Sequence, residues 1–199
     1  MSAPLDPAAA VPRLWTVGHS TLEQAAFIEL LRAHGIQGIA DVRRTPASRR
    51  HPQFGEQALR AALESQGLGY RWLPDLGGRR QPRPDSPNTA WRQPIFRGYA
   101  DHLQSAAFAG ALNALLAYAT GRRVAILCAE RSWRRCHRGL IADALSLRGV
   151  EVIHILDARH VEPHVLNPAV RLVDGRIVYP HPDPSPHQGD LFAPSAEGA

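Results

Sequence analysis

Nucleophilic and titratable side chains gather at three places in the sequence, each beside the end of a short apolar run. The three groups are Gly18, His19 and Ser20; Asp41 and Arg43; and Cys128, Glu130, Cys136, His137 and Arg138. Ligands of open α/β sheets bind outside the carboxyl ends of parallel strands. We therefore expect the three groups to meet at one edge of a sheet and to form one site.

Two carboxylates and a histidine are the candidate catalytic residues. Glu130 follows a run typical of a buried strand, where burial raises a carboxylate pKa and suits it to act as an acid, base or nucleophile. The alternative for Glu130 is an ion pair with a neighbouring arginine. Asp41 either supplies the second carboxylate or orients Arg43. His137 and Arg138 are expected in the first turn of a helix, where backbone N–H groups favour phosphate, or form a simple polar helix start.

The cysteines raise two further alternatives. The spacing Cys-x7-Cys-His of Cys128, Cys136 and His137 lacks the second ligand pair of a closed zinc site, so we predict no metal and no cofactor. A thiol at a helix N-terminus has a lowered pKa and can act as a nucleophile. No Gly-rich cradle follows Cys128, which places thiol chemistry behind carboxylate chemistry.

Other candidate binding residues lie in two predicted loops and at the start of a predicted strand. They are Ser48, Arg49, Tyr70, Gly77 and Gly78. The glycine pair permits close approach of the backbone to a ligand. Tyr70, like Trp72 and Trp91, lies near an Arg-containing loop and suits stacking on a base, the alternative being ordinary packing.

Strands and helices must alternate to position these groups. β-favouring apolar runs predict strands at 14–17, 38–42, 70–73, 124–128 and 150–156, and helical patterns predict helices at 21–34, 55–66, 105–120 and 136–147. Thr21 and Gln24 form a predicted capping box, and 76–94 is a predicted loop. The alternation predicts a single-domain α/β fold with a doubly wound, mostly parallel sheet of Rossmann-like or flavodoxin-like layering.

Length and composition limit the class of protein. The chain has 199 residues, 44% of them hydrophobic and 21% charged, which suits one globular core. It contains neither a run of about 18 apolar residues nor a signal-peptide pattern, so we expect a cytoplasmic protein without a membrane partner. We divide it into a flexible N-terminus (1–12), an α/β domain (13–179) and a Pro-rich disordered tail (180–199).

Arginine supplies every basic side chain, and the net charge is +5. A GC-rich genome is one explanation. The other is that arginine serves anionic ligands, because its planar fork binds phosphate in a bidentate way and clustered positive charge attracts nucleic acid. The clustering at 43–50 and 131–138 favours the second explanation, and DNA is the predicted partner.

The tail carries one apolar pair in a polar setting. Gln188, Asp190, Leu191 and Phe192 resemble the short motif by which bacterial DNA polymerases and repair proteins bind the sliding clamp. An exposed apolar pair in a disordered segment suits a partner's groove. The alternative is a tail that folds back onto the domain.

Five spaced motifs together resemble a known bacterial family. They are Thr16–Ser20; Asp41–Arg43 with Pro46, Ser48, Arg49 and Phe54; Leu76–Gly78; Cys128–Glu130; and Cys136–Arg138. The chain is similar over 14–156 to domain-of-unknown-function family 488. Residues 131–135 depart from its pattern, which usually has a proline there. The resemblance implies an α/β fold and a shared site, and it implies no settled reaction.

The predicted function is a DNA-acting enzyme, most specifically a repair glycosylase. In N-glycosidic hydrolysis one carboxylate stabilises or attacks the sugar and the other handles protons. A flipped base needs a pocket, for which the loop 76–94 is the expected wall. A nuclease would need more carboxylates on metal. The alternatives are a nucleotide or sugar-phosphate enzyme using the same site, and a non-catalytic DNA-repair adaptor.

Overall fold

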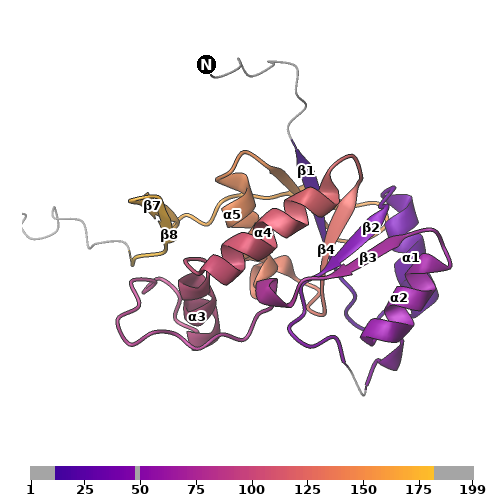
Figure 1. The fold of residues 1–199 in the computed structure, drawn as a ribbon, viewed down its shortest axis with the longest axis horizontal. Coiled ribbons are helices and arrows are strands. Elements are labelled where there is room, and N and C mark those ends of the chain that lie inside the picture. The colour runs from indigo at the N-terminus through magenta and orange to yellow at the C-terminus, as the bar shows by residue number, and fades with distance from the viewer. Residues whose placement is uncertain (1–11, 48–49, 182–199) are drawn as a thin grey trace, which may run out of the picture.

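The computed structural model describes residues 12–47 and 50–181, and one sheet dominates that part of the chain (Figure 1). Its strands are β1 (Arg13–Gly18), β2 (Gly38–Asp41), β3 (Gly69–Trp72), β4 (Val124–Cys128), β5 (Glu151–Ile155) and β6 (Val161–Pro163). Their order across the sheet is β3-β2-β4-β1-β5-β6. The first five strands are parallel, and β6 pairs antiparallel with β5 at one edge.

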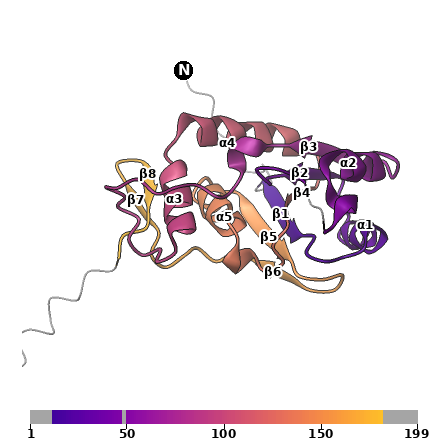
Figure 2. The ribbon, with the colours of Figure 1, turned by 90° about the horizontal axis from the view of Figure 1, so that it is seen from below.

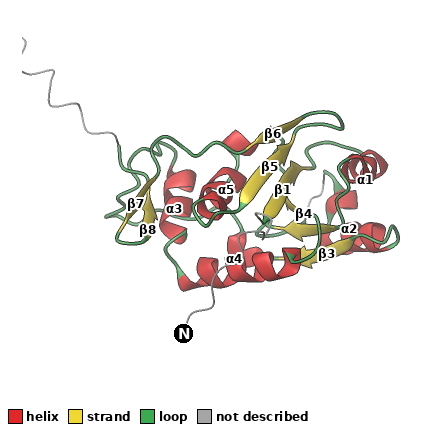
Figure 3. Ribbon diagram, turned by 90° about the horizontal axis from the view of Figure 1, so that it is seen from above, coloured by secondary structure: helices red, strands yellow, loops and turns green. Residues whose placement is uncertain are grey.

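Helices cover both faces of this sheet. They are α1 (Gln24–Ala33), α2 (Glu56–Glu64), α3 (Pro94–His102), α4 (Ala106–Ala119) and α5 (Arg138–Ser146), with short 3-10 turns at Pro52–Phe54, Pro74–Leu76 and Trp133–Arg135. Figures 2 and 3 show α1 and α2 on one side and α3, α4 and α5 on the other. The predicted doubly wound α/β fold is confirmed.

Alternation of side chains along the strands builds the two cores. In β4, Ala125 and Leu127 pack with α1 and α2, whereas Val124 and Ile126 pack with α4 and α5. Successive side chains of a strand point to opposite faces, so a strand covered on both faces must be apolar throughout. The unbroken apolar run at 124–128 is therefore the pattern of the strand at the centre of both cores.

The start of the first helix differs from its prediction. The helix begins at Gln24, its N-cap is Glu23, and no side chain caps it. The predicted capping box of Thr21 and Gln24 is therefore wrong. Ser20 adopts a left-handed conformation with φ of 48°, which turns the chain before Thr21, and the Gln24 amide instead donates to the Gln53 carbonyl at 2.7 Å.

A separate helix, which was not predicted from the sequence, lies before residue 105. Helix α3 begins with Pro94, a residue that suits the first helical position. Helix α4 then begins after Ser105, whose Oγ accepts from the Phe108 N–H. Within α3, Asp101 is buried and accepts hydrogen bonds from Arg83 N, Ser86 Oγ and Asn88 Nδ2. These contacts hold the predicted loop 76–94 against the domain.

The last strand predicted from the sequence is 150–156, yet three more follow among the described residues. Besides β6, the strands β7 (Arg171–Val173) and β8 (Arg176–Val178) form a hairpin. Its turn is Asp174–Gly175, with φ of 47° and 74°, as a tight hairpin requires. Tyr179 then donates from its hydroxyl to Asp143 at 2.9 Å. Apart from Pro12, Pro180 and His181, the predicted flexible N-terminus and tail lie outside the described residues.

Over the same described ranges, no helix combines the length and the apolar character that crossing a bilayer requires.

Gly18 gives the first testable prediction. A Cβ at Gly18 would lie 2.8 Å from the Glu130 carbonyl carbon and closer still to its oxygen, whereas a Cβ at Gly110 in α4 meets nothing within 4 Å. We expect Gly18→Ala to lower the free energy of unfolding by at least about 2 kcal/mol, because backbone cannot yield as a side chain does. Gly110→Ala, the control, should raise it by about 0.5–1 kcal/mol.

Urea unfolding of the two variants and the parent at pH 7 measures both changes. A Gly18→Ala protein as stable as the parent would show that the loops after β1 and β4 are not in contact.

Candidate functional site

The loops that follow β1 and β4 are joined beyond the ends of their strands. His19 N donates to the Cys128 carbonyl at 3.1 Å, and Ser20 N donates to the Ala129 carbonyl at 2.9 Å. These bonds bring the first and third predicted groups together at the carboxyl edge, as expected from the parallel pairing of the two strands.

A buried ionic network occupies the end of β2. Asp41 is fully buried, and its carboxylate accepts from Arg43 Nε at 2.9 Å and from the Tyr70 hydroxyl at 2.8 Å. Arg43 Nη1 donates to the Phe54 carbonyl at 2.7 Å. Burial, followed by the neighbouring Asp41, raises the pKa of Tyr70. Asp41 thus orients Arg43, one of the two roles that the sequence left open. Tyr70 is buried, so its ring is not exposed for stacking on a base.

His19 closes this network from the side of β1. Its ring stacks on Phe54 with centroids 4.1 Å apart, and its Nδ1 lies 3.0 Å from the Ser20 carbonyl. Arg43 Nη1 faces Nε2 at 3.4 Å. Burial, with the charge of Arg43 second, lowers the pKa of His19 to about 4. His19 is therefore neutral at pH 7, with its proton on Nδ1 donated to Ser20.

Two free thiols and an imidazole form a second cluster. Cys128 Sγ, Cys136 Sγ and His137 Nδ1 all lie within 4.8 Å of one another. The hydrogen bond to Cys136, then burial, raises the pKa of Cys128. Burial opposes ionisation of Cys136, but Cys128, His137 and Arg138 together hold the pKa of Cys136 well below its usual value. The pair therefore favours a thiol that donates to a thiolate.

The two glycines after Leu76 allow close packing, Gly78 against this cluster and Gly77 against Arg44. A Cβ at Gly78 would lie 2.8 Å from His137 Nδ1, and a Cβ at Gly77 would lie 2.7 Å from the Arg44 Cα. The loop can approach both groups because it carries no side chain there. His137 Nε2, at 3.1 Å from the Val42 carbonyl, fixes the other edge of the ring.

Arg138 is almost fully buried and supports the loop that carries Glu130. Its Nε donates to Cys136 Sγ at 3.3 Å, and its Nη2 donates to the carbonyls of Glu130 and Arg131. The guanidinium is thus occupied by protein groups on more than one side.

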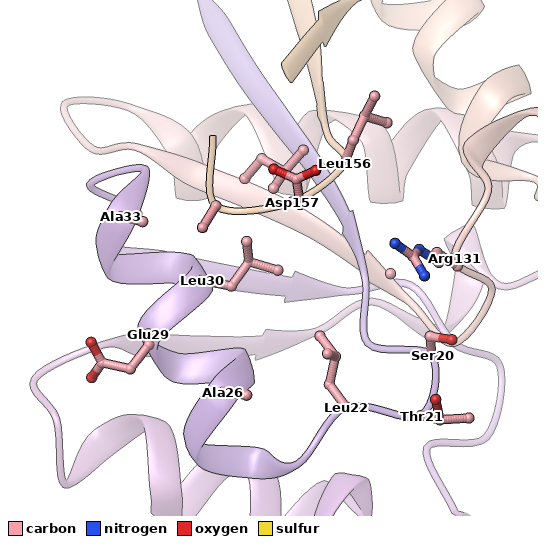
Figure 4. Close-up of a pocket in the computed structure, with 13 residues that line it drawn as sticks. Ser20, Thr21, Leu22, Ala26, Glu29, Leu30, Ala33, Arg131, Leu156 and Asp157 are labelled. Carbon is pink, nitrogen blue, oxygen red and sulfur yellow. The ribbon is translucent and has the colours of Figure 1, made fainter. Parts of the chain in front are cut away.

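Two adjoining hollows lie at the carboxyl edge, beside this loop. The larger, of about 550 Å³, is bounded by residues of α1 and of the loops after β1, β4 and β5, and the smaller, of about 290 Å³, shares with it Arg131, Leu156 and Asp157. Figure 4 shows Arg131 and Asp157 facing the larger hollow, with Leu22 and Leu30 across from them. The volume of the larger hollow is within the range of small-molecule sites.

The carboxylates of the smaller hollow are Glu130 and Asp157. Glu130 is exposed, so its predicted burial is wrong, and its Oε1 accepts from Ser132 N at 3.2 Å. Hydrogen bonds from the backbone N–H of Arg159 and from the ring of His160 lower the pKa of Asp157 to about 2. Asp157 was not among the residues predicted from the sequence, although it directly follows the predicted strand 150–156, as the other groups follow theirs.

The predicted site residues thus divide into three sets. Gly18, Ser20 and Glu130 line the hollows; His19, Asp41, Arg43 and Tyr70 form the buried network; and Gly78, Cys128, Cys136, His137 and Arg138 form the thiol cluster and its supports. No residue of the loop 76–94 lines either hollow. Ser48, Arg49 and the tail residues Gln188, Asp190, Leu191 and Phe192 lie outside the described residues.

Comparison with known proteins identifies a family and no function. A family model described as domain of unknown function DUF488 matches residues 23–145. No curated protein and no solved structure matches the chain.

The buried neutral His19 makes a prediction about pH. In the unfolded chain a histidine binds its proton below about pH 6.5, but folded His19 does so only near pH 4. Stability should therefore fall as the pH is lowered from 6.5 towards 4, with His19 contributing about 3 kcal/mol of the loss. Urea unfolding of His19→Gln at pH 7 and at pH 4.5 should show a loss smaller by about 2–3 kcal/mol than that of the parent. Equal losses in the two proteins would contradict the neutral state of His19.

Proposed function

This chain belongs to the family described as domain of unknown function DUF488, and we propose that it is a DNA-acting enzyme that removes a modified or damaged base by hydrolysis of its N-glycosidic bond. The observation that carries the proposal is that Glu130 and Asp157 line one hollow together with Arg131 and Arg134. Two carboxylates can serve the hydrolysis, and arginines beside them can contact the DNA phosphates.

The two carboxylates suit different roles. The low pKa of Asp157 keeps it ionised at neutral pH, so it cannot deliver a proton there, but it can stabilise the positive charge that develops on the sugar. Glu130 is exposed beside it and can accept a proton from water. Water then adds its oxygen to C1′ and gives one proton to Glu130, and the C1′–N bond breaks with its electrons on the base. The base takes up a proton from solvent as it leaves, and Glu130 returns its proton to solvent.

The larger hollow is the proposed base pocket. Leu22, Leu30 and Leu156 supply apolar surface, and Ser20, Thr21 and Arg131 supply polar groups for an edge of the base. A flipped base is commonly held in this way, between apolar surface and a few polar contacts. In this arrangement the guanidinium of Arg131 donates a hydrogen bond to the departing base.

Some arginines are buried in the domain and others are exposed on one loop. The exposed ones support a DNA contact at that loop. Arg43 and Arg138 are buried, whereas Arg131, Arg134 and Arg135 are exposed on the loop after β4. Arg134 pairs with Glu162 and stacks on Trp133. Arg135, exposed on the same loop as Glu130 and Arg131, is therefore the side chain that we assign to phosphate.

The alternatives from the sequence use the same surface. A nucleotide or sugar-phosphate enzyme would occupy the same hollows with a free metabolite. An adaptor would bind DNA through the arginines and would not depend on Glu130. The carboxylate experiment below separates both alternatives from the glycosylase.

Substitution of the two carboxylates tests the reaction. Glu130→Gln and Asp157→Asn should each lower the single-turnover rate of base release by about 100-fold or more, with DNA binding retained, because both changes remove charge and keep shape. The substrates are labelled duplexes, each with one modified or damaged base, followed by alkali treatment. Nucleosides and nucleotides are assayed in parallel.

Glu64→Gln, an exposed change on α2, is the matched control and should keep the parent rate. Release from free nucleotides alone would favour the metabolite enzyme. Absence of release from every duplex, with and without Mg²⁺, or full activity of Glu130→Gln, would reject the glycosylase.

The clamp motif leads to a separate proposal about partners, which rests on the sequence alone. We propose that Gln188–Phe192 binds a bacterial sliding clamp through Leu191 and Phe192. A labelled peptide spanning 186–195 should bind the purified clamp in a polarisation assay, and the full chain should compete with it. The double change Leu191→Ala and Phe192→Ala should abolish competition without lowering base release. Equal competition by this variant would exclude the motif as the contact.

A further inference from the structure

Three potential metal ligands lie close together beside the loop that carries Glu130. None of them lines the two hollows. They are Cys128 Sγ at the end of β4, Cys136 Sγ just before α5, and His137 Nδ1. We propose that these residues bind one thiophilic metal ion. The proposal does not depend on the glycosylase reaction.

The distances between the three atoms suit one shared ion. His137 Nδ1 lies 4.0 Å from Cys128 Sγ and 3.7 Å from Cys136 Sγ. Bonds of about 2.3 Å to sulfur and about 2.0 Å to nitrogen, spread tetrahedrally or trigonally, place ligand atoms about 3.5–4.0 Å apart. An ion can therefore enter with movements smaller than a bond length.

The imidazole is held in the tautomer that a metal needs. His137 Nε2 is 3.1 Å from the Val42 carbonyl, an acceptor only, so Nε2 carries the proton and Nδ1 presents its lone pair to the two sulfurs. A backbone carbonyl commonly holds the second ring nitrogen of a metal-binding histidine in this way. Gly78 and Tyr99 lie against the ring and restrict its rotation.

Charge and ligand number favour a monovalent ion. Within the described residues the cluster offers three ligands, and structural Zn²⁺ usually takes four. Two thiolates with Cu⁺ carry one net negative charge, which the buried guanidinium of Arg138 beside Cys136 would balance. Zn²⁺ in the same place would leave a net positive charge in a buried position, which is costly. Cu⁺ also prefers soft thiolate ligands.

The position of the cluster gives the ion a structural role. Its ligands flank both ends of the segment 129–135, which carries Glu130 and Arg131. An ion bound to all three would join the end of β4 to the start of α5. Arg138 already joins the same parts through the Glu130 carbonyl.

Metal titration of the reduced, metal-free protein tests the site. The probes are Cu⁺, added anaerobically in competition with a chromophoric Cu⁺ chelator, and Zn²⁺, added in competition with a zinc chelator. We expect one Cu⁺ per chain, retained through gel filtration. Cys128→Ser, Cys136→Ser and His137→Gln should each weaken binding by more than about 100-fold, which exceeds the usual effect of changes outside the ligand shell. His102→Gln, a half-buried histidine on α3, is the matched control and should bind as the parent does.

X-ray absorption of the loaded parent gives a second measurement that needs no variant. It should show two sulfur ligands and one nitrogen ligand. If Zn²⁺ is retained with the same ligands and Cu⁺ is not, the metal site is supported and its ion is Zn²⁺. Binding of neither ion, binding unaffected by the serine variants, or a ligand shell without sulfur would overturn the proposal.

Discussion

The backbone carbonyl of Glu130 is the point on which the carboxyl edge of this protein depends. Gly18 lies against it with no room for a Cβ, and the buried guanidinium of Arg138 donates to it from α5. Three elements, β1, β4 and α5, therefore meet at one acceptor. The Glu130 side chain is exposed, although its backbone is held by these contacts. This combination suits a functional group that must be accessible and yet precisely placed.

Burial of charge beneath that edge explains how the arginines are used. Arg43 and Arg138 are taken into the domain, where each donates to several acceptors: Asp41 and the Phe54 carbonyl for the first, Cys136 and loop carbonyls for the second. A buried charge is tolerated only when its hydrogen bonds are made by protein groups. These two side chains therefore organise the edge, whereas the arginines of the loop after β4 at 131, 134 and 135 are exposed.

The C-terminal segment is attached through a second buried polar chain. Thr16 Oγ1 lies 2.7 Å from His154, His154 lies 3.0 Å from His164, and His164 lies 3.0 Å from Asp143. Burial, with His164 second, lowers the pKa of His154 to about 3, so this ring is neutral. The chain joins β1, β5 and α5 to the segment after β6. It thereby also supports the strand that ends beside Asp157.

The alternation of the five parallel strands with α1, α2, α4 and α5 followed from the sequence alone, because it depends on local patterns. The apolar run 124–128 and the polar groups just after each strand were enough to predict a doubly wound sheet and the edge at which those groups meet. The Asp174–Gly175 turn was an equally local signal for the last hairpin, and it was overlooked. Asp157 could have been found by the rule that selected Glu130, since it too follows a strand.

Only the tertiary structure decided which of these groups are exposed and which are buried and hydrogen-bonded within the protein. Asp41 and Glu130 are indistinguishable as carboxylates after a strand, yet Arg43 and Tyr70 enclose one while the other faces solvent. Likewise, Cys128 and Cys136 gave no ligand pattern in sequence, but the turn between β4 and α5 brings them to one imidazole. The burial and hydrogen-bond partners of a side chain depend on contacts between residues far apart in the chain. Local spacing in the sequence does not predict those contacts.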